Sequence, residues 1–124
     1  MSHTPEDVLA IVTDRKPSLL IGIEETAQVD FKSEPYDLAT DKGKWELGKD
    51  TAGMTNFAGG LIVIGVFTVK ADGNFSEVAS ARCPVEKRSL NARQYHDVIR
   101  SMVRPAIRFE CAFHEDPDEP GKAT

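Results

Sequence analysis

A run of aliphatic residues from Leu61 to Val66, interrupted by one glycine, predicts a central strand that is buried on both faces. Gly59 and Gly60 stand immediately before this run. Because glycine adopts positive φ without a Cβ clash, the pair predicts the end of a helix and a turn into the strand. Gly65 predicts a bulge, or a close approach by another backbone or a ligand. The chain is therefore expected to be organised around a helix, a glycine corner and a buried strand.

Two other segments alternate apolar and polar residues, which predicts strands with one exposed face. In the segment from Thr26 to Glu34, the expected buried side chains are Ala27, Val29 and Phe31. The same alternation extends from Ile107 to Phe113 and predicts a late strand.

A hairpin is expected directly after the central run. The strand is predicted to continue to Val69, where Asp72 and Gly73 supply a turn typical of antiparallel strands. A returning strand is then predicted from Phe75 to Ala79. The central strand would thus lie between this strand and the one from Thr26 to Glu34.

Three segments carry helix signals. Thr4, Pro5 and two acidic residues open the first helix, which Pro17 ends. The third helix is expected to begin at a cap on Ser89 or Asn91 and to run through residue 103, before a proline. The segment between residues 19 and 23 is apolar but short, so it is either a strand or a segment laid across the core.

The second helix is required by the glycine pair and is predicted from Trp45 to Ala58, after a charged surface loop over residues 37–44. Gly48 and Gly53 lie within it, which suggests close packing of its backbone on the sheet. Its candidate buried residues are Trp45, Ala52, Met54, Phe57 and Ala58.

These elements predict an α/β (α+β) fold, a single domain with a central mixed β-sheet and flanking helices. Residues 1–18 are expected to form the N-terminal helix and residues 19–113 the main domain. Residues 114–124 are acidic, rich in proline and without large apolar side chains. They are therefore expected to be a disordered tail or a linker.

Charge and cysteine content narrow the function classes. The formal net charge of -5 means that a nucleic acid would have to meet a local basic patch, because the mean field repels phosphate. Cys83 and Cys111 lack the spacing of a zinc site or a disulfide framework. The sequence shows neither a signal peptide nor an apolar segment of membrane-spanning length, so a soluble, cytoplasmic protein without membrane partners is expected.

Three motifs occur in the order seen in one family. Glu25 is followed after four residues by Asp30-Phe31-Lys32, then come Leu47-Gly48-Lys49-Asp50 and the stretch from Asn56 to Val66, which closes in Gly-Val. This pattern resembles the Schlafen-type, AlbA-like nucleic-acid-binding domain over roughly residues 19–113. The resemblance implies a domain of bacterial regulators or defence-associated proteins.

In eukaryotic Schlafens this kind of domain cleaves RNA at a three-carboxylate metal site. The resemblance places Glu25 and Asp30 at its first two positions, with Lys32 beside them as a further catalytic residue if the site is active. The third acid would fall on Phe67 or Thr68, neither of which is a useful ligand for Mg²⁺ or Mn²⁺. Metal binding by the first two acids is therefore expected to be weak, and nuclease activity poor or absent. The alternative interpretation of Asp30 and Lys32 is an ion pair on an exposed strand.

Two groups of basic residues are candidates for nucleic-acid binding. The lysines around Trp45 could form a basic patch on which this ring stacks against a base, or Trp45 could instead anchor its helix in the core. The arginines near the third helix could bind phosphate or form surface salt bridges. The candidate residues are Lys32, Lys44, Trp45, Lys49, Asn56, Arg100 and Arg104.

The sequence therefore predicts an RNA- or single-stranded-DNA-binding domain. One alternative is a metal-dependent ribonuclease that uses Glu25 and Asp30. The other is a protein–protein interaction module, with a homodimer formed through exposed strand edges.

Overall fold

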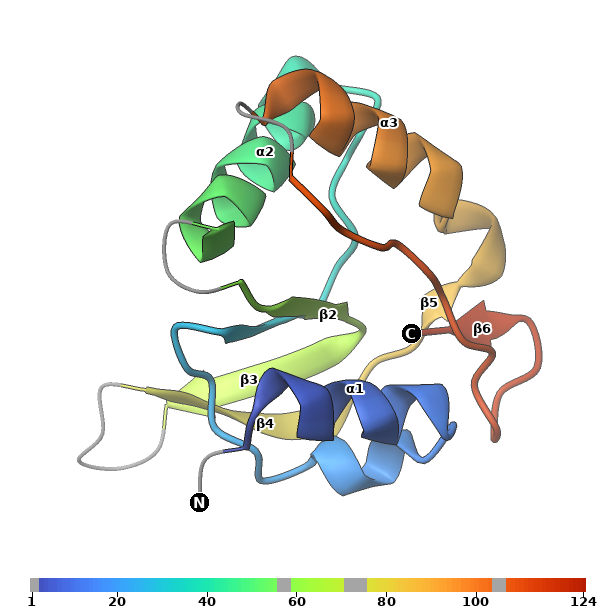
Figure 1. Ribbon diagram of the computed structural model, residues 1–124. Coiled ribbons are helices and arrows are strands. Elements are labelled where there is room, and N and C mark those ends of the chain that lie inside the picture. The colour runs from blue at the N-terminus through green and yellow to red at the C-terminus, as the bar shows by residue number, and fades with distance from the viewer. Residues whose placement is uncertain (1–2, 56–58, 71–75, 104–106) are drawn as a thin grey trace.

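Short strands lie between two groups of helices in a mixed α+β arrangement (Figure 1). The computed structural model describes residues 3–55, 59–70, 76–103 and 107–124. In these ranges the α-helices are α1 (Pro5–Thr13), α2 (Asp41–Thr55) and α3 (Ala92–Met102), and the 3₁₀ helices are η1 (Pro17–Leu20) and η2 (Lys87–Ser89). The strands are β1 (Val29–Lys32), β2 (Leu61–Ile64), β3 (Val66–Lys70), β4 (Glu77–Arg82), β5 (Val85–Glu86) and β6 (Lys122–Ala123).

The predicted central strand is present but divides at Gly65 into β2 and β3. β2 pairs in parallel with β1, and β3 pairs antiparallel with β4, so the neighbours are those expected from the sequence. Gly65 has a φ of +106°, and a Cβ there would lie 3.3 Å from the carbonyl oxygen of Cys83. Of the two alternatives predicted for this glycine, the close approach of another backbone is confirmed, whereas the bulge lies further along, between Phe67 and Thr68. The strands form pairs rather than one continuous sheet.

The segment that precedes β1 lies along the other edge of β4. The backbone N–H of Gly22 donates to the carbonyl of Ala79 at 2.8 Å, and the N–H of Glu25 donates to the carbonyl of Glu77 at 2.8 Å. A tight turn from Thr26 to Val29 then starts β1. Ala27 is exposed in this turn, so its predicted burial is wrong.

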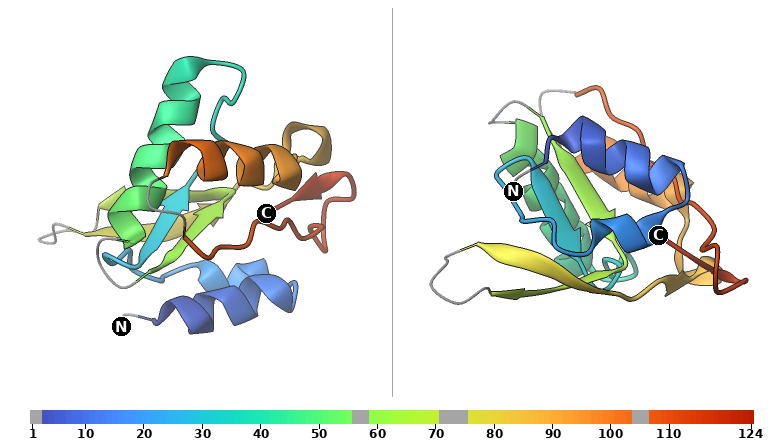
Figure 2. Two further views of the ribbon diagram at one scale, coloured as in Figure 1. Left: turned by 45° about the horizontal axis from the view of Figure 1, so that its top comes forward. Right: turned by 90° about the horizontal axis from the view of Figure 1, so that it is seen from below.

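Helices cover both sides of the strands (Figures 1 and 2). On one side α1, capped by Thr4 as predicted, and η1 pack on the strands. The core there consists of Val8, Val12, Leu20, Ile23, Val29, Phe31, Val63, Val66 and Ala79. On the other side α2 and α3 enclose a second cluster of Leu38, Leu47, Val98, Ile99 and Val103.

The predicted packing of α2 on the sheet is not found at either of the two glycines that suggested it, although one of them makes a close contact elsewhere. A Cβ on Gly48 would lie 3.0 Å from the Cβ of Met102, so α2 approaches α3 here rather than the sheet. A Cβ on Gly53 would meet no atom within 4 Å. Trp45 is 56% exposed, so its predicted place in the core is also wrong. The other end of the predicted helix, Phe57 and Ala58, lies outside the described residues.

The glycine corner and the hairpin are each described in part. Gly59 has a φ of +84° and its N–H donates to the carbonyl of Met54, as expected of a residue that closes a helix. The predicted turn at Asp72 and Gly73 lies outside the described residues. The strands that flank it pair antiparallel, with a bulge between Phe67 and Thr68.

The predicted strand from Ile107 to Phe113 is wrong, although its alternation is real. Ile107, Phe109 and Cys111 pack against the second cluster, but these residues form no strand. Alternation reports burial of every second side chain, and an extended segment laid on a helix produces it without strand pairing. The third helix, in contrast, begins at Asn91 as predicted, because the Asn91 side chain accepts from the N–H of Gln94.

Residues 114–124, which we call the strap, are ordered rather than disordered. β6 pairs antiparallel with β5, and His114 and Thr124 exchange backbone hydrogen bonds of 3.0 Å. The prediction of disorder failed because the many acids of the strap meet fixed cations, as described below, and backbone pairing replaces the missing apolar burial. In the described ranges, no helix has the length and apolarity needed to cross a membrane.

Candidate functional site

The structure brings Glu25 and Asp30 together, as the sequence predicts, and adds a third acid to them. Glu25 accepts a 2.8 Å hydrogen bond from the N–H of Phe31 through its carboxylate Oε2. Its side chain also shares hydrogen bonds with Asp30 and Glu77. Nothing in the sequence indicates Glu77, because its approach to Glu25 depends on the pairing of the segment before β1 with β4.

Glu25 therefore sits in a place that favours a protonated carboxyl group. Partial burial, followed by the hydrogen bonds and negative charge of its acidic neighbours, raises the pKa of Glu25 to about 8. The N–H of Phe31 acts in the opposite direction but is outweighed. At neutral pH a proton on Glu25 lets one carboxyl group donate a hydrogen bond to another.

Lys32 links Asp30 to Asp50 on α2. Its Nζ lies 3.3 Å from Asp30 and 3.5 Å from Asp50. Partial burial tends to lower the pKa of Lys32, but the two carboxylates outweigh burial and raise it. The ion-pair interpretation of Asp30 and Lys32 is confirmed, and Lys32 is held by acids rather than directed at phosphate.

Two tyrosines continue the network towards α3. The hydroxyl of Tyr36 donates to Asp50 at 2.6 Å, and the N–H of Tyr36 donates to the hydroxyl of Tyr95 at 2.9 Å. Their rings meet edge to face with centroids 6.2 Å apart. Burial, followed by the Asp50 carboxylate, raises the pKa of Tyr36. The network thus joins β4, β1, α2 and α3 through side chains.

The sequence position expected of a third metal ligand holds no carboxylate. Phe67 is 50% exposed on β3, and neither it nor Thr68 carries a carboxylate. Asp72, the nearest substitute by sequence, lies outside the described residues. Within those residues, no group of three His, Cys, Asp or Glu side chains is arranged to hold a metal ion.

The second candidate region is the exposed face of α2. Lys42, Trp45 and Lys49 are all exposed, and their spacing of three and four residues places them on one face of the helix. Lys49 Nζ lies 5.0 Å from the centroid of the Trp45 ring, a cation–π contact. Lys44 is half-buried and its spacing places it on a different face.

Three predicted residues remain, of which the structure describes Arg100. Arg100 is exposed on α3. Arg93 and Asp97 on the same helix form a loose pair at 4.0 Å, as the salt-bridge alternative predicted. Asn56 and Arg104 lie outside the described residues, so their predicted contacts with nucleic acid stay predictions.

No protein-family model matches the chain, and a search of curated proteins and of solved structures gave no match.

Proposed function

We propose that the domain binds single-stranded nucleic acid, RNA or single-stranded DNA, on the face of α2 formed by Lys42, Trp45 and Lys49. The observation that carries the proposal is the exposure of Trp45 with Lys49 beside its ring. An exposed indole gives a base a surface for stacking, and nearby ammonium groups attract the backbone phosphates. The motif-level resemblance to Schlafen-type, AlbA-like domains supports a role in a regulator or a defence-associated protein.

The charge of the chain determines where a nucleic acid can bind and how binding should respond to salt. A chain with a net charge of -5 repels phosphate on average, so binding has to be local and salt-sensitive. Lys32 adds little to it, because Asp30 and Asp50 already neutralise this lysine. Lys49 covers one face of the indole, so a base would stack on the other face or displace the lysine.

The test is a titration of labelled single-stranded RNA and DNA at two salt concentrations, followed by anisotropy and by the fluorescence of Trp45, the one tryptophan of the chain. Trp45→Ala is expected to weaken binding by about 5- to 100-fold, the range for loss of one stacked base. Lys42→Gln with Lys49→Gln is expected to reduce the slope of log affinity against log salt by about 1.4.

Phe67→Ala is the matched control, because Phe67 is a similarly exposed aromatic residue on β3, outside the proposed face. Its affinity should equal that of the parent chain. Binding that persists in Trp45→Ala, or that does not change with salt, would show that the α2 face is not the nucleic-acid site.

The alternative function, a protein–protein interaction module or homodimer, draws on a different surface. Phe67 and Val69 on β3 are 50% and 45% exposed and point to the same face of the strand. Sedimentation of the parent chain and of Phe67→Ser over a range of concentrations tests it. A dimer that the substitution weakens, together with no binding of nucleic acid, would favour this alternative.

A further inference from the structure

The strap is held at one end by strand pairing. Val85 pairs with Ala123 and Glu86 with Lys122, and the N–H of Lys87 donates to the carbonyl of Gly121 at 3.0 Å. Ala123 is fully buried. The edge of β5 therefore receives an extended segment in the way that many peptide-binding domains do, by addition of a strand.

At its other end the strap presents carboxylates to one guanidinium group. Asp116 has a fully buried side chain and is paired with Arg82, whose second terminal nitrogen lies 2.9 Å from Asp118. The free oxygen of Asp116 accepts the N–H groups of Asp118 and Glu119. This turn fixes both carboxylates in the geometry that the planar guanidinium recognises.

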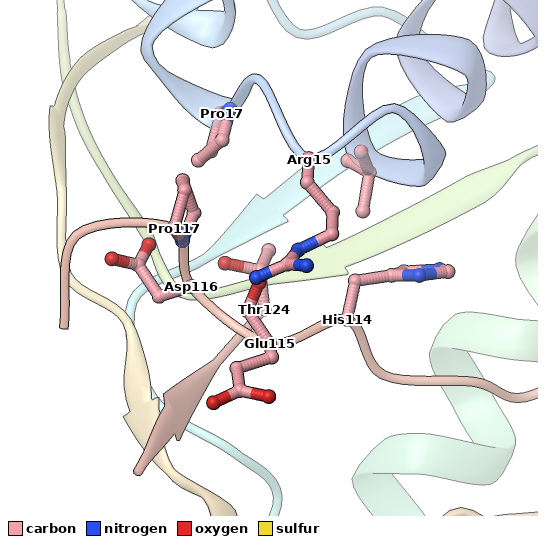
Figure 3. A pocket seen from close by; sticks show the side chains of 8 residues that line it. Arg15, Pro17, His114, Glu115, Asp116, Pro117 and Thr124 are labelled. Atoms are coloured by element: carbon pink, nitrogen blue, oxygen red, sulfur yellow. The ribbon is translucent and has the colours of Figure 1, made fainter. Parts of the chain in front are cut away.

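Two further cations complete the contact. Lys87 Nζ lies 3.0 Å from Glu115 Oε2, and Arg15 Nε donates to the carbonyl of Glu115 at 3.0 Å. Figure 3 shows Arg15 reaching from the end of α1 towards the strap, next to Thr124 and Glu115. The space left between α1 and the strap is about 10 Å³, the size of a single water molecule.

The strap does not saturate this site. Arg82 Nε is buried and has no hydrogen-bond partner among the described residues. A guanidinium group has five N–H donors, and an unpaired buried donor is costly. A ligand that supplies one more acceptor can therefore bind better than the strap does.

The strap is itself a hairpin, because His114 and Asp116 form backbone hydrogen bonds with Thr124 and Lys122, and only its second arm pairs with β5. We propose that the edge of β5 with Arg15, Arg82 and Lys87 is a receptor for an acidic peptide hairpin, and that the strap occupies it in cis as an autoinhibitory segment. A partner with the same chemistry, a strand preceded by a turn that carries carboxylates two residues apart, displaces the strap. The covered cations select for acidic side chains, and the β5 edge selects for an extended backbone, which a nucleic acid does not offer. The proposal is independent of binding at α2.

The test uses the full chain and a fluorescein-labelled peptide of residues 114–124, with affinity measured by anisotropy. Gly121→Ala weakens the strap without touching a charge, because Gly121 has a φ of +89° and a Cβ there would meet no atom within 4 Å. Since the peptide competes with a closed strap, this variant is expected to bind it about five- to tenfold more tightly than the parent chain.

Gly22→Ala is the matched control, because Gly22 has a similar φ of +93° and equally open surroundings but lies away from the strap. Its affinity for the peptide should equal that of the parent. Adding Arg82→Ala to Gly121→Ala should weaken binding at least tenfold. No peptide binding, equal affinity of Gly121→Ala and Gly22→Ala, or binding that survives Arg82→Ala would each overturn the proposal. A gain in affinity for RNA in place of the peptide would overturn it as well.

Discussion

Glu25 and Asp116 are carboxyl groups with other acids beside them, yet their pKa values shift in opposite directions. Burial tends to raise the pKa of both carboxyl groups. Around Asp116, the Arg82 guanidinium and two backbone N–H groups outweigh burial and lower the pKa below its ordinary value. Glu25 receives one N–H, and its other hydrogen-bonding neighbours are acids. The difference teaches that the supply of donors, rather than burial, decides whether an acid in this protein carries charge.

The largest effect is expected where the donor supply is removed. Arg82→Ala would leave the buried Asp116 carboxylate without its cation, which typically costs about 3–5 kcal/mol when the charge stays buried. The strap can detach and return Asp116 to water, which limits this cost. We therefore expect the free energy of unfolding, measured in urea, to fall by about 2–3 kcal/mol. Hydrogen exchange should show lost protection at Lys87 and Thr124 before any loss in β2.

Arg93→Ala is the control for this prediction, because Arg93 is 91% exposed and its partner is 4.0 Å away. Its effect should stay within about 0.5 kcal/mol. Equal losses for the two variants would mean that the Arg82–Asp116 pair does not hold the strap.

Acid should release the strap in the parent chain. Because the folded pKa of Asp116 is lowered, its contribution to stability is present above the ordinary value of 3.8 and is lost as the pH falls through the folded pKa below it. Exchange of the amide of Asp116, which donates to the carbonyl of Lys122, reports this opening once corrected for the intrinsic pH dependence. In Asp116→Asn the strap should be weaker and its opening free energy should no longer change over this pH range.

Glu25 should show the opposite pH dependence. Its folded pKa of about 8 exceeds the ordinary 4.5, so the native state holds a proton that the unfolded state releases, and stability falls as the pH rises from 4.5 to about 8. Glu25→Gln keeps an acceptor for the N–H of Phe31 but cannot ionise. We therefore expect it to unfold at higher urea concentration than the parent at pH 9, with a smaller difference at pH 5. A variant that is less stable than the parent at pH 9 would contradict the protonated state of Glu25.

The smallest effect is expected from divalent cations. A proton on Glu25 and the ammonium group of Lys32 already offset the negative charge of the acids there. The position of the third metal ligand holds Phe67 or Thr68. Mg²⁺ or Mn²⁺ should therefore produce little or no cleavage of tRNA or single-stranded RNA. Cleavage by the parent that disappears in a Glu25→Ala, Asp30→Ala double variant would show that the cluster is a working metal site.

The sequence predicted those parts of the fold that depend on local chemistry. The close backbone approach at Gly65 and the cap at Asn91, one of two candidates, follow from residues close to one another along the chain. The meeting of Glu25 with Asp30 was expected from the family resemblance. Trp45 was ambiguous, because an aromatic residue on a helix suits a core or a surface, and only the structure shows that its indole is exposed.

Long-range pairings could not be predicted. Glu77 reaches Glu25 through the ladder between β4 and the segment before β1, and nothing near Glu77 in the sequence indicates this contact. The strap was predicted to be disordered because its composition lacks apolar residues. Its order rests on Arg82 and Lys87, whose distance from the strap along the chain hides their charge complementarity.

Gly65 also separates two strand pairs, β1–β2 and β3–β4, that are expected to form at different times during folding. β3 and β4 are joined by a short connection, so their antiparallel pair requires little loop closure. β1 reaches its parallel partner β2 only across the whole of α2. The β3–β4 pair is thus expected to form early in folding, and the β1–β2 pair late, when α2 is in place. One glycine thereby separates a fast-forming half of the central run from a slow-forming half.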